Sequence, residues 1–269
     1  MYPRAPMPPI ELASVDGSIS PTAETLIPLR DDGLYRGDGA FEVLRLYGGR
    51  PYTFVEHLDR LERSAATIEM SFDRGAFETE IEALLREFGP EDGLLRLIVT
   101  RSGRRIAATE PLPSHGDTLS LAAVTYSPSV ILNGVKSLSY AANMQATRLA
   151  KARGAEEAVL VTPDGTVLEA PTSSLFWVSP QGALRTTALD AGILDSITRT
   201  RVIAALHVEE GHWPVADLRA ASEAFLASTT RDIQAVSALD GKRFAEAPGP
   251  RTREAVEAFE ATVRAELDS

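Results

Sequence analysis

The sequence predicts an α+β fold, and three observations support this class. Segments with alternating apolar residues, typical of strands, are mixed with segments whose apolar residues recur at helical spacing. Strands and helices do not alternate regularly, as they would in a doubly wound parallel sheet. Gly-, Pro- and Asp-containing turns separate several neighbouring strands, as in antiparallel hairpins. A chain of 269 residues is long enough to bury one large core or two smaller ones.

The first half of the chain begins with a predicted hairpin over residues 40–54, with its turn at Gly48-Gly49. Two amphipathic helices are expected next, and strands are expected at Leu94–Thr100 and Leu119–Tyr126. The apolar positions that define the helices are Phe54, Leu58, Leu61, Ala65 and Ile68, then Phe77, Ile81, Leu84, Leu85 and Phe88.

A linker is predicted at residues 127–134, because Pro, Asn and Gly punctuate this segment. It would separate an N-terminal domain, residues 1–126, from a C-terminal domain, residues 135–269. Met1–Ile10 contains four prolines and no apolar signal core, so a short extended arm is expected there.

The second half is predicted to open with a helix that runs to about Arg153, where Gly154 stops it. A second helix should begin after the capping pair Asp195-Ser196, and a polar helix is expected from about Thr252. Strands are expected at Glu157–Thr162, Thr166–Glu169, Ser174–Val178 and Glu223–Ser228, followed by a hairpin around Asp240-Gly241.

The composition argues against several functional classes. With 27 basic and 38 acidic residues, the net charge of −11 argues against binding to a nucleic-acid backbone. No apolar run approaches the roughly 20 residues that span a bilayer. The chain contains no cysteine, and its four histidines are scattered without metal-site spacing, so no metal is expected. These features together predict a soluble cytoplasmic protein.

Lysine is rare: only Lys136, Lys151 and Lys242 occur among the 27 basic residues. Arginine cannot act as an amine nucleophile, so amine chemistry would depend on one of these three. Lys151, near a helix end, and Lys242, beside a turn, fit an exposed surface position. Lys136 lies between apolar segments, where desolvation would favour the neutral amine, although this environment alone favours a structural role.

Five sequence blocks, in order over about residues 30–245, resemble class IV aminotransferases, the fold-type IV enzymes that use pyridoxal phosphate. The blocks are Gly37-Asp38-Gly39-Ala40-Phe41-Glu42, Glu56-His57-Leu58-Asp59-Arg60-Leu61, the region from Lys136-Ser137-Leu138-Ser139 to Ser173-Ser174-Leu175-Phe176, Gly192-Ile193-Leu194-Asp195-Ser196, and Ser228-Thr229-Thr230. The resemblance implies a small N-terminal α/β domain and a larger C-terminal β-barrel-like domain with helices. It also implies a homodimer whose active site the partner subunit completes.

The resemblance further implies a role for each matching residue. Lys136 would bind the cofactor's aldehyde as an internal aldimine, Glu169 would keep the pyridine nitrogen protonated, and Arg60 would pair with the phosphate. The backbone of Ile197 and Thr198 would bind the same phosphate, since free N–H groups at a helix N-terminus favour an anion. The remaining cofactor-binding candidates are Ser173, Thr229 and Thr230.

The substrates implied are an amino acid and a 2-oxo acid. Lys-Ser-Leu-Ser at the lysine resembles the D-amino-acid aminotransferase and aminodeoxychorismate lyase branches, and branched-chain L-amino-acid aminotransferases remain a third alternative. The substrate-binding candidates are Arg36, Phe41, Arg101 and Arg104, the arginines being candidates for the α-carboxylate. Tyr140 could contact the cofactor's phenolic oxygen or pack in the core.

Overall fold

The computed structural model describes residues 11–268, in which the chain forms two compact units. The arm predicted at Met1–Ile10 lies outside the described residues. Unit 1 contains the chain up to Pro113 together with Lys136–Leu138, and unit 2 contains Ser114–Val135 and the chain from Ser139. Each unit combines helices with a sheet, which confirms the α+β class.

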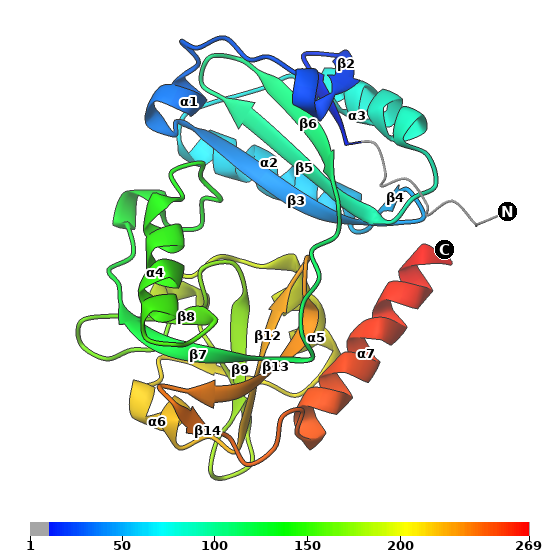
Figure 1. Ribbon diagram of the computed structural model, residues 1–269. Helices are drawn as coiled ribbons and strands as arrows, with labels where there is room; N and C mark the ends of the chain where they lie inside the picture. Colours follow the sequence, from blue (N-terminus) through cyan, green and yellow to red (C-terminus); the bar gives the residue numbers. More distant parts are fainter. Residues whose placement is uncertain (1–10, 269) are drawn as a thin grey trace, which may run out of the picture. The chain divides into compact units, whose positions relative to one another are not determined.

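Unit 1 is built on a six-stranded antiparallel sheet with the order β2-β1-β6-β5-β3-β4 (Figure 1). The predicted hairpin and both amphipathic helices are confirmed. The elements are β1 (Leu12–Val15), β2 (Ser18–Pro21), η1 (Thr22–Glu24, a 3₁₀-helix), α1 (Asp32–Arg36), β3 (Gly39–Tyr47), β4 (Arg50–Pro51), α2 (Phe54–Thr67), α3 (Arg74–Phe88), β5 (Gly93–Thr100) and β6 (Arg105–Glu110).

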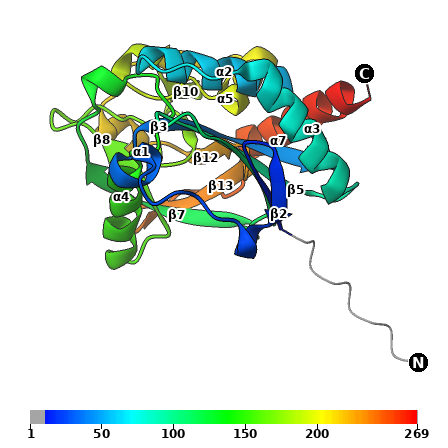
Figure 2. The same cartoon turned by 90° about the horizontal axis from the view of Figure 1, so that it is seen from above.

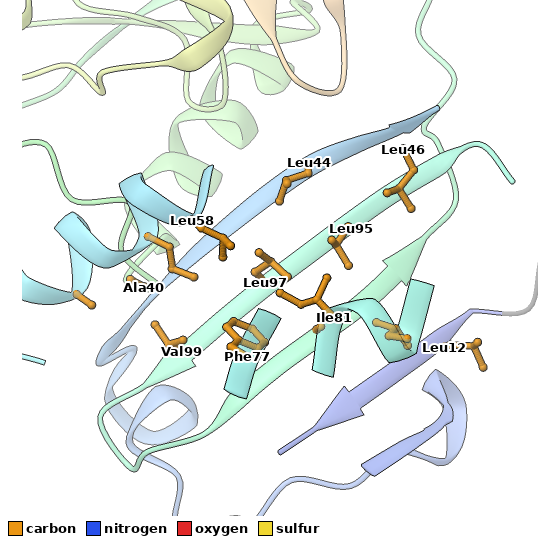
Figure 3. Packing of buried hydrophobic residues seen from close by; sticks show 14 of the residues in the cluster. Leu12, Ala40, Leu44, Leu46, Leu58, Phe77, Ile81, Leu95, Leu97 and Val99 are labelled. Carbon is orange, nitrogen blue, oxygen red and sulfur yellow. The ribbon is translucent and has the colours of Figure 1, made fainter. Parts of the chain in front are cut away.

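The core of unit 1 lies between one face of this sheet and the helices α2 and α3 (Figure 2). Successive strand residues point to opposite faces, so every second residue of β3 and β5 lies on this face. Figure 3 shows these aliphatic side chains together with those from the two helices. The fully buried members include Ala40, Leu44, Leu46, Leu58, Phe77, Ile81, Leu95, Leu97 and Val99.

A short return of the chain adds to the free edge of β3. Ser137 forms an antiparallel bridge with Ala40, and backbone hydrogen bonds join Phe41 N to Lys136 O and Leu138 N to Gly39 O. These contacts explain why residues 136–138 belong to unit 1 although the chain on either side belongs to unit 2.

Unit 2 contains a curled mixed sheet with the order β11-β10-β9-β12-β13-β7-β8, and β14 pairs with β13. Pairing is parallel at β10–β11, β13–β7 and β7–β8, and antiparallel elsewhere. The strands are β7 (Thr118–Thr125), β8 (Glu157–Val161), β9 (Ser174–Val178), β10 (Leu184–Thr187), β11 (Glu209–Gly211), β12 (Glu223–Ser228), β13 (Asp232–Leu239) and β14 (Lys242–Arg243).

α4, α5 and α7 cover one face of this sheet, and α6 packs against the opposite face. α4 packs on β7 and β8, whereas α5 and α7 pack on each other and on β12. The helices are η2 (Val130–Leu132, 3₁₀), α4 (Ala141–Ala152), η3 (Leu189–Ala191, 3₁₀), α5 (Ile197–Ala205), α6 (Val215–Arg219) and α7 (Pro250–Leu267). The helices predicted to end near Arg153, to follow Ser196 and to begin near Thr252 are all present.

Two boundaries differ from the sequence-based assignment. Residues 118–125 form β7 of unit 2, because this strand pairs with β8 and β13, whereas the sequence assigns them to the first domain. Alternation identifies a strand but not the sheet it joins. The strand predicted at Thr166–Glu169 is wrong: this segment makes only isolated bridges, at Val161–Val167 and Thr166–Pro214.

Candidate active site

Lys136 is held in unit 1 by its backbone and by an aromatic ring. Its N–H donates to Ser64 Oγ of α2 at 3.2 Å, and its carbonyl accepts from Phe41 N at 3.0 Å. The ammonium nitrogen Nζ lies 4.6 Å from the centroid of the Phe41 ring, which is a cation–π distance. The structure therefore places Phe41, a predicted substrate-binding residue, against Lys136.

Arg60, one helical turn before Ser64, forms a bidentate pair with Glu42 of β3. Nε donates to Oε1 and Nη2 donates to Oε2, both at 2.7 Å, and both side chains are buried. Burial alone would raise the pKa of Glu42, but the charge and hydrogen bonds of Arg60 outweigh it and lower this pKa to about 2. Glu42 is therefore ionised and fixes the plane of the guanidinium.

His57 completes this buried group, with Nδ1 2.8 Å from Glu42 Oε2. Burial lowers the pKa of His57, and the positive charges of Arg60 and Lys136 lower it further, against the opposing effect of Glu42. A neutral imidazole can donate from Nδ1 to the carboxylate. Glu42 thus contacts both Arg60 and His57, and the charges of Arg60 and Lys136 act on the imidazole.

Glu42 and His57 belong to the sequence motifs, but the motifs alone assign neither residue a role. The sequence indicates that Glu42 needs a buried partner, but not which residue supplies it. Glu42 occupies the face of β3 that Ala40 and Leu44 share, so its carboxylate falls in an apolar row and requires a partner. His57 and Arg60 flank Leu58 on the buried side of α2 and supply that partner.

Unit 2 positions Glu169 and the predicted phosphate helix. Oε1 of Glu169 accepts a hydrogen bond from Leu194 N at 2.9 Å, which orients the carboxylate. α5 begins directly after Ser196, whose Oγ accepts from Arg199 N at 3.3 Å. Ile197 and Thr198 therefore occupy the first turn, where N–H groups lack partners within the helix, and Thr198 is buried.

The hydroxyl-bearing candidates lie at one end of the strands β9 and β12. Ser174 pairs with Ala227, so Ser173 and Ser228 extend the same end of the sheet. The Oγ atoms of Ser173 and Ser228 are buried and have no hydrogen-bond partner in the described part of the chain. Thr229 and Thr230 follow in the turn between β12 and β13. Buried hydroxyls of this kind require an additional acceptor or donor.

Tyr140 has a hydrogen bond within unit 2. Its OH donates to the Pro171 carbonyl at 2.5 Å, and Asn143 Nδ2 donates to the same oxygen at 2.8 Å. Both donors come from the start of α4, so they fix the segment that links Glu169 to Ser173.

The arginines predicted to bind substrate each pair with a different aspartate of unit 1. Arg36 is exposed on α1 and pairs with Asp32 one turn earlier, and Arg104 pairs with Asp16. Arg101 contacts Asp38 at 2.6 Å and also donates to two carbonyls at the end of α2, those of Ile68 and Glu69. These pairs account for all three arginines structurally, so their role in substrate binding stays a prediction.

Within residues 11–268, no group of three or more His, Asp or Glu side chains is arranged to hold a metal ion. Over the same residues, no helix has the length and apolar character that a membrane crossing requires.

The sequence matches the family model described as "Amino-transferase class IV" over residues 39–239, which is most of the chain. The chain belongs to this family. It is therefore a pyridoxal-phosphate-dependent transaminase, and the family assignment made from the five sequence blocks is confirmed.

Two curated relatives and one solved structure illustrate the range of similar proteins. A D-alanine aminotransferase of Bacillus licheniformis is 30% identical, over 93% of this chain and 96% of that protein. An aminodeoxychorismate lyase of Bacillus subtilis is 26% identical, over 88% and 90% of the two chains. The pyridoxal-phosphate-bound structure of an aminotransferase from Mycobacterium tuberculosis, titled hypothetical, has a TM-score of 0.85 at 24% identity and covers 94% of this chain and 98% of its own. This likeness confirms the fold-type IV architecture.

The residues present fit pyridoxal phosphate. Unit 1 provides an amine at Lys136 beside a buried, oriented guanidinium. Unit 2 provides an oriented carboxylate, a helix N-terminus and the partnerless hydroxyls of Ser173 and Ser228, which suit an anionic, hydrogen-bonding ligand.

Proposed function

We propose that this transaminase transfers an amino group between a D-amino acid and a 2-oxo acid. The observation that carries the proposal is the similarity over nearly the whole chain to D-alanine aminotransferases, at about 30% identity, combined with the Lys-Ser-Leu-Ser sequence at Lys136. When bound, pyridoxal phosphate supplies an electron-accepting ring conjugated to the reacting carbon.

In this proposal Lys136 Nζ would bind the cofactor's aldehyde with loss of water, would be released as a free amine when the substrate's amine replaces it, and would then move the proton of the substrate's Cα. The contact with the Phe41 ring limits where Nζ can lie, and the backbone bonds to Ser64 and Phe41 fix the residue. A base held in a fixed position accelerates proton transfer, because it is already in the reactive geometry when the substrate binds.

Glu169 holds the proton on the pyridine nitrogen, and the Leu194 amide keeps its carboxylate in one orientation. The phosphate takes its charge partner from Arg60 and its hydrogen-bond donors from Ile197, Thr198, Ser173, Thr229 and Thr230. Because Glu42 and His57 orient Arg60 before any ligand arrives, the guanidinium loses little conformational freedom on binding.

The experiment is a panel of half-reactions with the purified holoenzyme. The visible absorbance of the bound cofactor is followed after addition of D-alanine, L-alanine, or a branched-chain L-amino acid. Loss of the band with D-alanine alone supports the proposal. Loss with L-amino acids alone contradicts it and points to the branched-chain activity.

Aminodeoxychorismate lyase is the second candidate, because a relative carrying that name matches 88% of the chain. This reaction releases pyruvate and 4-aminobenzoate from aminodeoxychorismate. A coupled assay that detects 4-aminobenzoate, together with an inert half-reaction panel, would establish the lyase in place of the transaminase.

We also propose that the enzyme is a homodimer that uses segment 127–134 as a contact. Two large apolar residues of η2, Val130 and Ile131, are 89% and 85% exposed, which is unfavourable unless a partner covers them. Ile131→Asp should convert a dimer into a monomer in analytical ultracentrifugation. The variant Val55→Asp changes another exposed apolar residue and should leave the mass unchanged.

A further inference from the structure

We propose that unit 2 carries a second anion site, separate from the residues assigned to the cofactor, which binds the phosphoryl group of a small metabolite. The site is a cavity of about 470 Å³ between the C-terminal end of α4 and the turn between β12 and β13. This volume falls in the range of about 300–1,000 Å³ typical of small-molecule sites. Arg231 and Gln234 form its buried side, and His115 and Lys151 form its exposed rim.

Basic side chains outnumber acidic ones in the lining of this cavity, although the protein as a whole is acidic. Lys151 and Arg231 both line it in a chain of net charge −11, and His115 adds an imidazole to the lining. Glu156 is the acidic residue in the lining, and its carboxylate is already engaged by the N–H and the hydroxyl of Ser120, at 2.7 and 3.0 Å. The lining therefore holds two cations and one carboxylate, and that carboxylate also accepts two hydrogen bonds from Ser120.

Arg231 lacks a hydrogen-bond partner for one of its donors. Its side chain is only 13% exposed, yet its ion pair with Glu157 is long, at 3.3 Å. Its Nη1 donates to Gln234 Oε1 and lies 3.5 Å from His115 Nδ1, and its Nη2 donates to Glu157, whereas its Nε is buried and has no hydrogen-bond partner among the described residues. A buried guanidinium with an unused donor is costly unless an acceptor reaches it.

Glu157 does not accept a hydrogen bond from Arg231 Nε, because its carboxylate oxygens have other partners. Its Oε1 accepts from the Thr147 hydroxyl and from Ala158 N, so only Oε2 faces Arg231. Burial lowers the pKa of Arg231, in keeping with a cation that its surroundings only partly neutralise. An oxyanion in the cavity would offer acceptors to the lysine and the imidazole at its rim and to the guanidinium of Arg231.

A phosphoryl group fits these donors better than a carboxylate. Three separate elements bring a guanidinium, an ammonium and an imidazole to one cavity, and a phosphoryl group has three oxygens and up to two charges to meet them. The cavity also exceeds the size of inorganic phosphate, which leaves room for the organic part of a phosphate ester.

The test is isothermal titration of the holoenzyme, dialysed free of excess cofactor, with inorganic phosphate, glycerol 3-phosphate and acetate at constant ionic strength. We expect one saturable phosphate site per chain, tighter binding of the ester, and no saturable acetate binding. Arg231→Gln and Lys151→Gln should each weaken binding about tenfold or more, because each removes a charged hydrogen-bond donor. Lys242→Gln, which changes an exposed lysine outside the cavity, should bind normally.

Lys151 is exposed and makes no described ion pair, so its variant should fold even if Arg231→Gln is destabilised by the loss of the Glu157 contact. A second readout locates the ligand: the ring proton resonances of His115, assigned with His115→Gln, should move when phosphate is added. Saturable acetate binding as tight as that of phosphate, equal phosphate binding in all three lysine and arginine variants, or no saturable phosphate binding would each overturn the proposal.

Discussion

Replacing Glu42 by Gln should destabilise unit 1, because the variant leaves Arg60 buried without its counter-charge. The pKa of Glu42 is lowered from 4.5 to about 2, which corresponds to roughly 3 kcal/mol of unfolding free energy at neutral pH. Removing one member of a buried ion pair costs about 3–5 kcal/mol, which agrees with this value. The expected loss is therefore about 3 kcal/mol at pH 7.

The lowered pKa of Glu42 also predicts how the free energy of unfolding changes with pH. A lowered folded-state pKa stabilises the protein above the unfolded-state value of 4.5, and this stabilisation disappears as the pH falls toward 2. The difference between wild type and Glu42→Gln should therefore shrink by about 2 kcal/mol between pH 6 and pH 3.

Urea unfolding followed by far-ultraviolet circular dichroism measures both effects. Tryptophan fluorescence is unsuitable, because Trp177 and Trp213 both lie in unit 2. Glu78→Gln is the matched control, since Glu78 also pairs with an arginine, Arg74, but is 39% exposed and should contribute at most about 1 kcal/mol. Equal stabilities and equal pH slopes for the two variants would refute the reasoning.

Three further variants test the proposed site. Lys136→Ala should abolish turnover and the visible absorbance of lysine-bound cofactor, while Lys242→Ala, assayed in parallel, should retain both. Glu169→Gln should lower kcat by about 100-fold or more, because the amide cannot hold the pyridine proton; steady-state kinetics with unchanged activity would contradict its role. Ser196→Ala should lower the unfolding free energy by about 1 kcal/mol through loss of the α5 cap, and should weaken cofactor binding in an equilibrium titration; unchanged stability would show that the cap contributes nothing.

The sequence was sufficient for elements whose own apolar pattern defines them. Ser174–Val178 and Glu223–Ser228 were predicted with the bounds that β9 and β12 have, since both are short, fully buried apolar runs. β6 was missed, because its small and charged residues carry a weak strand signal and its position depends on pairing with β1 and β5. The five-residue helices α1 and α6 were missed for a similar reason, since so short a helix depends on its surroundings.

In the candidate site, too, features with a local sequence signal could be predicted and features that depend on distant contacts could not. The α5 N-terminus could be predicted from a capping residue followed by a helical segment, which is a local signal. Glu42 could not be paired with Arg60 from local pattern, because the two residues are 18 positions apart and meet only when α2 packs on β3. The aspartate partners of the candidate arginines were likewise invisible, since Arg104 and Asp16 are 88 positions apart.

The return of residues 136–138 to the edge of β3 has a consequence for dissecting the enzyme. A fragment that ends at Pro113 would retain the six strands and three helices described for unit 1 but would lose the lysine and expose the β3 edge. A peptide that spans the missing residues could then restore the edge by strand addition. Split-protein complementation at this position would therefore report docking of Lys136 separately from folding of the sheet.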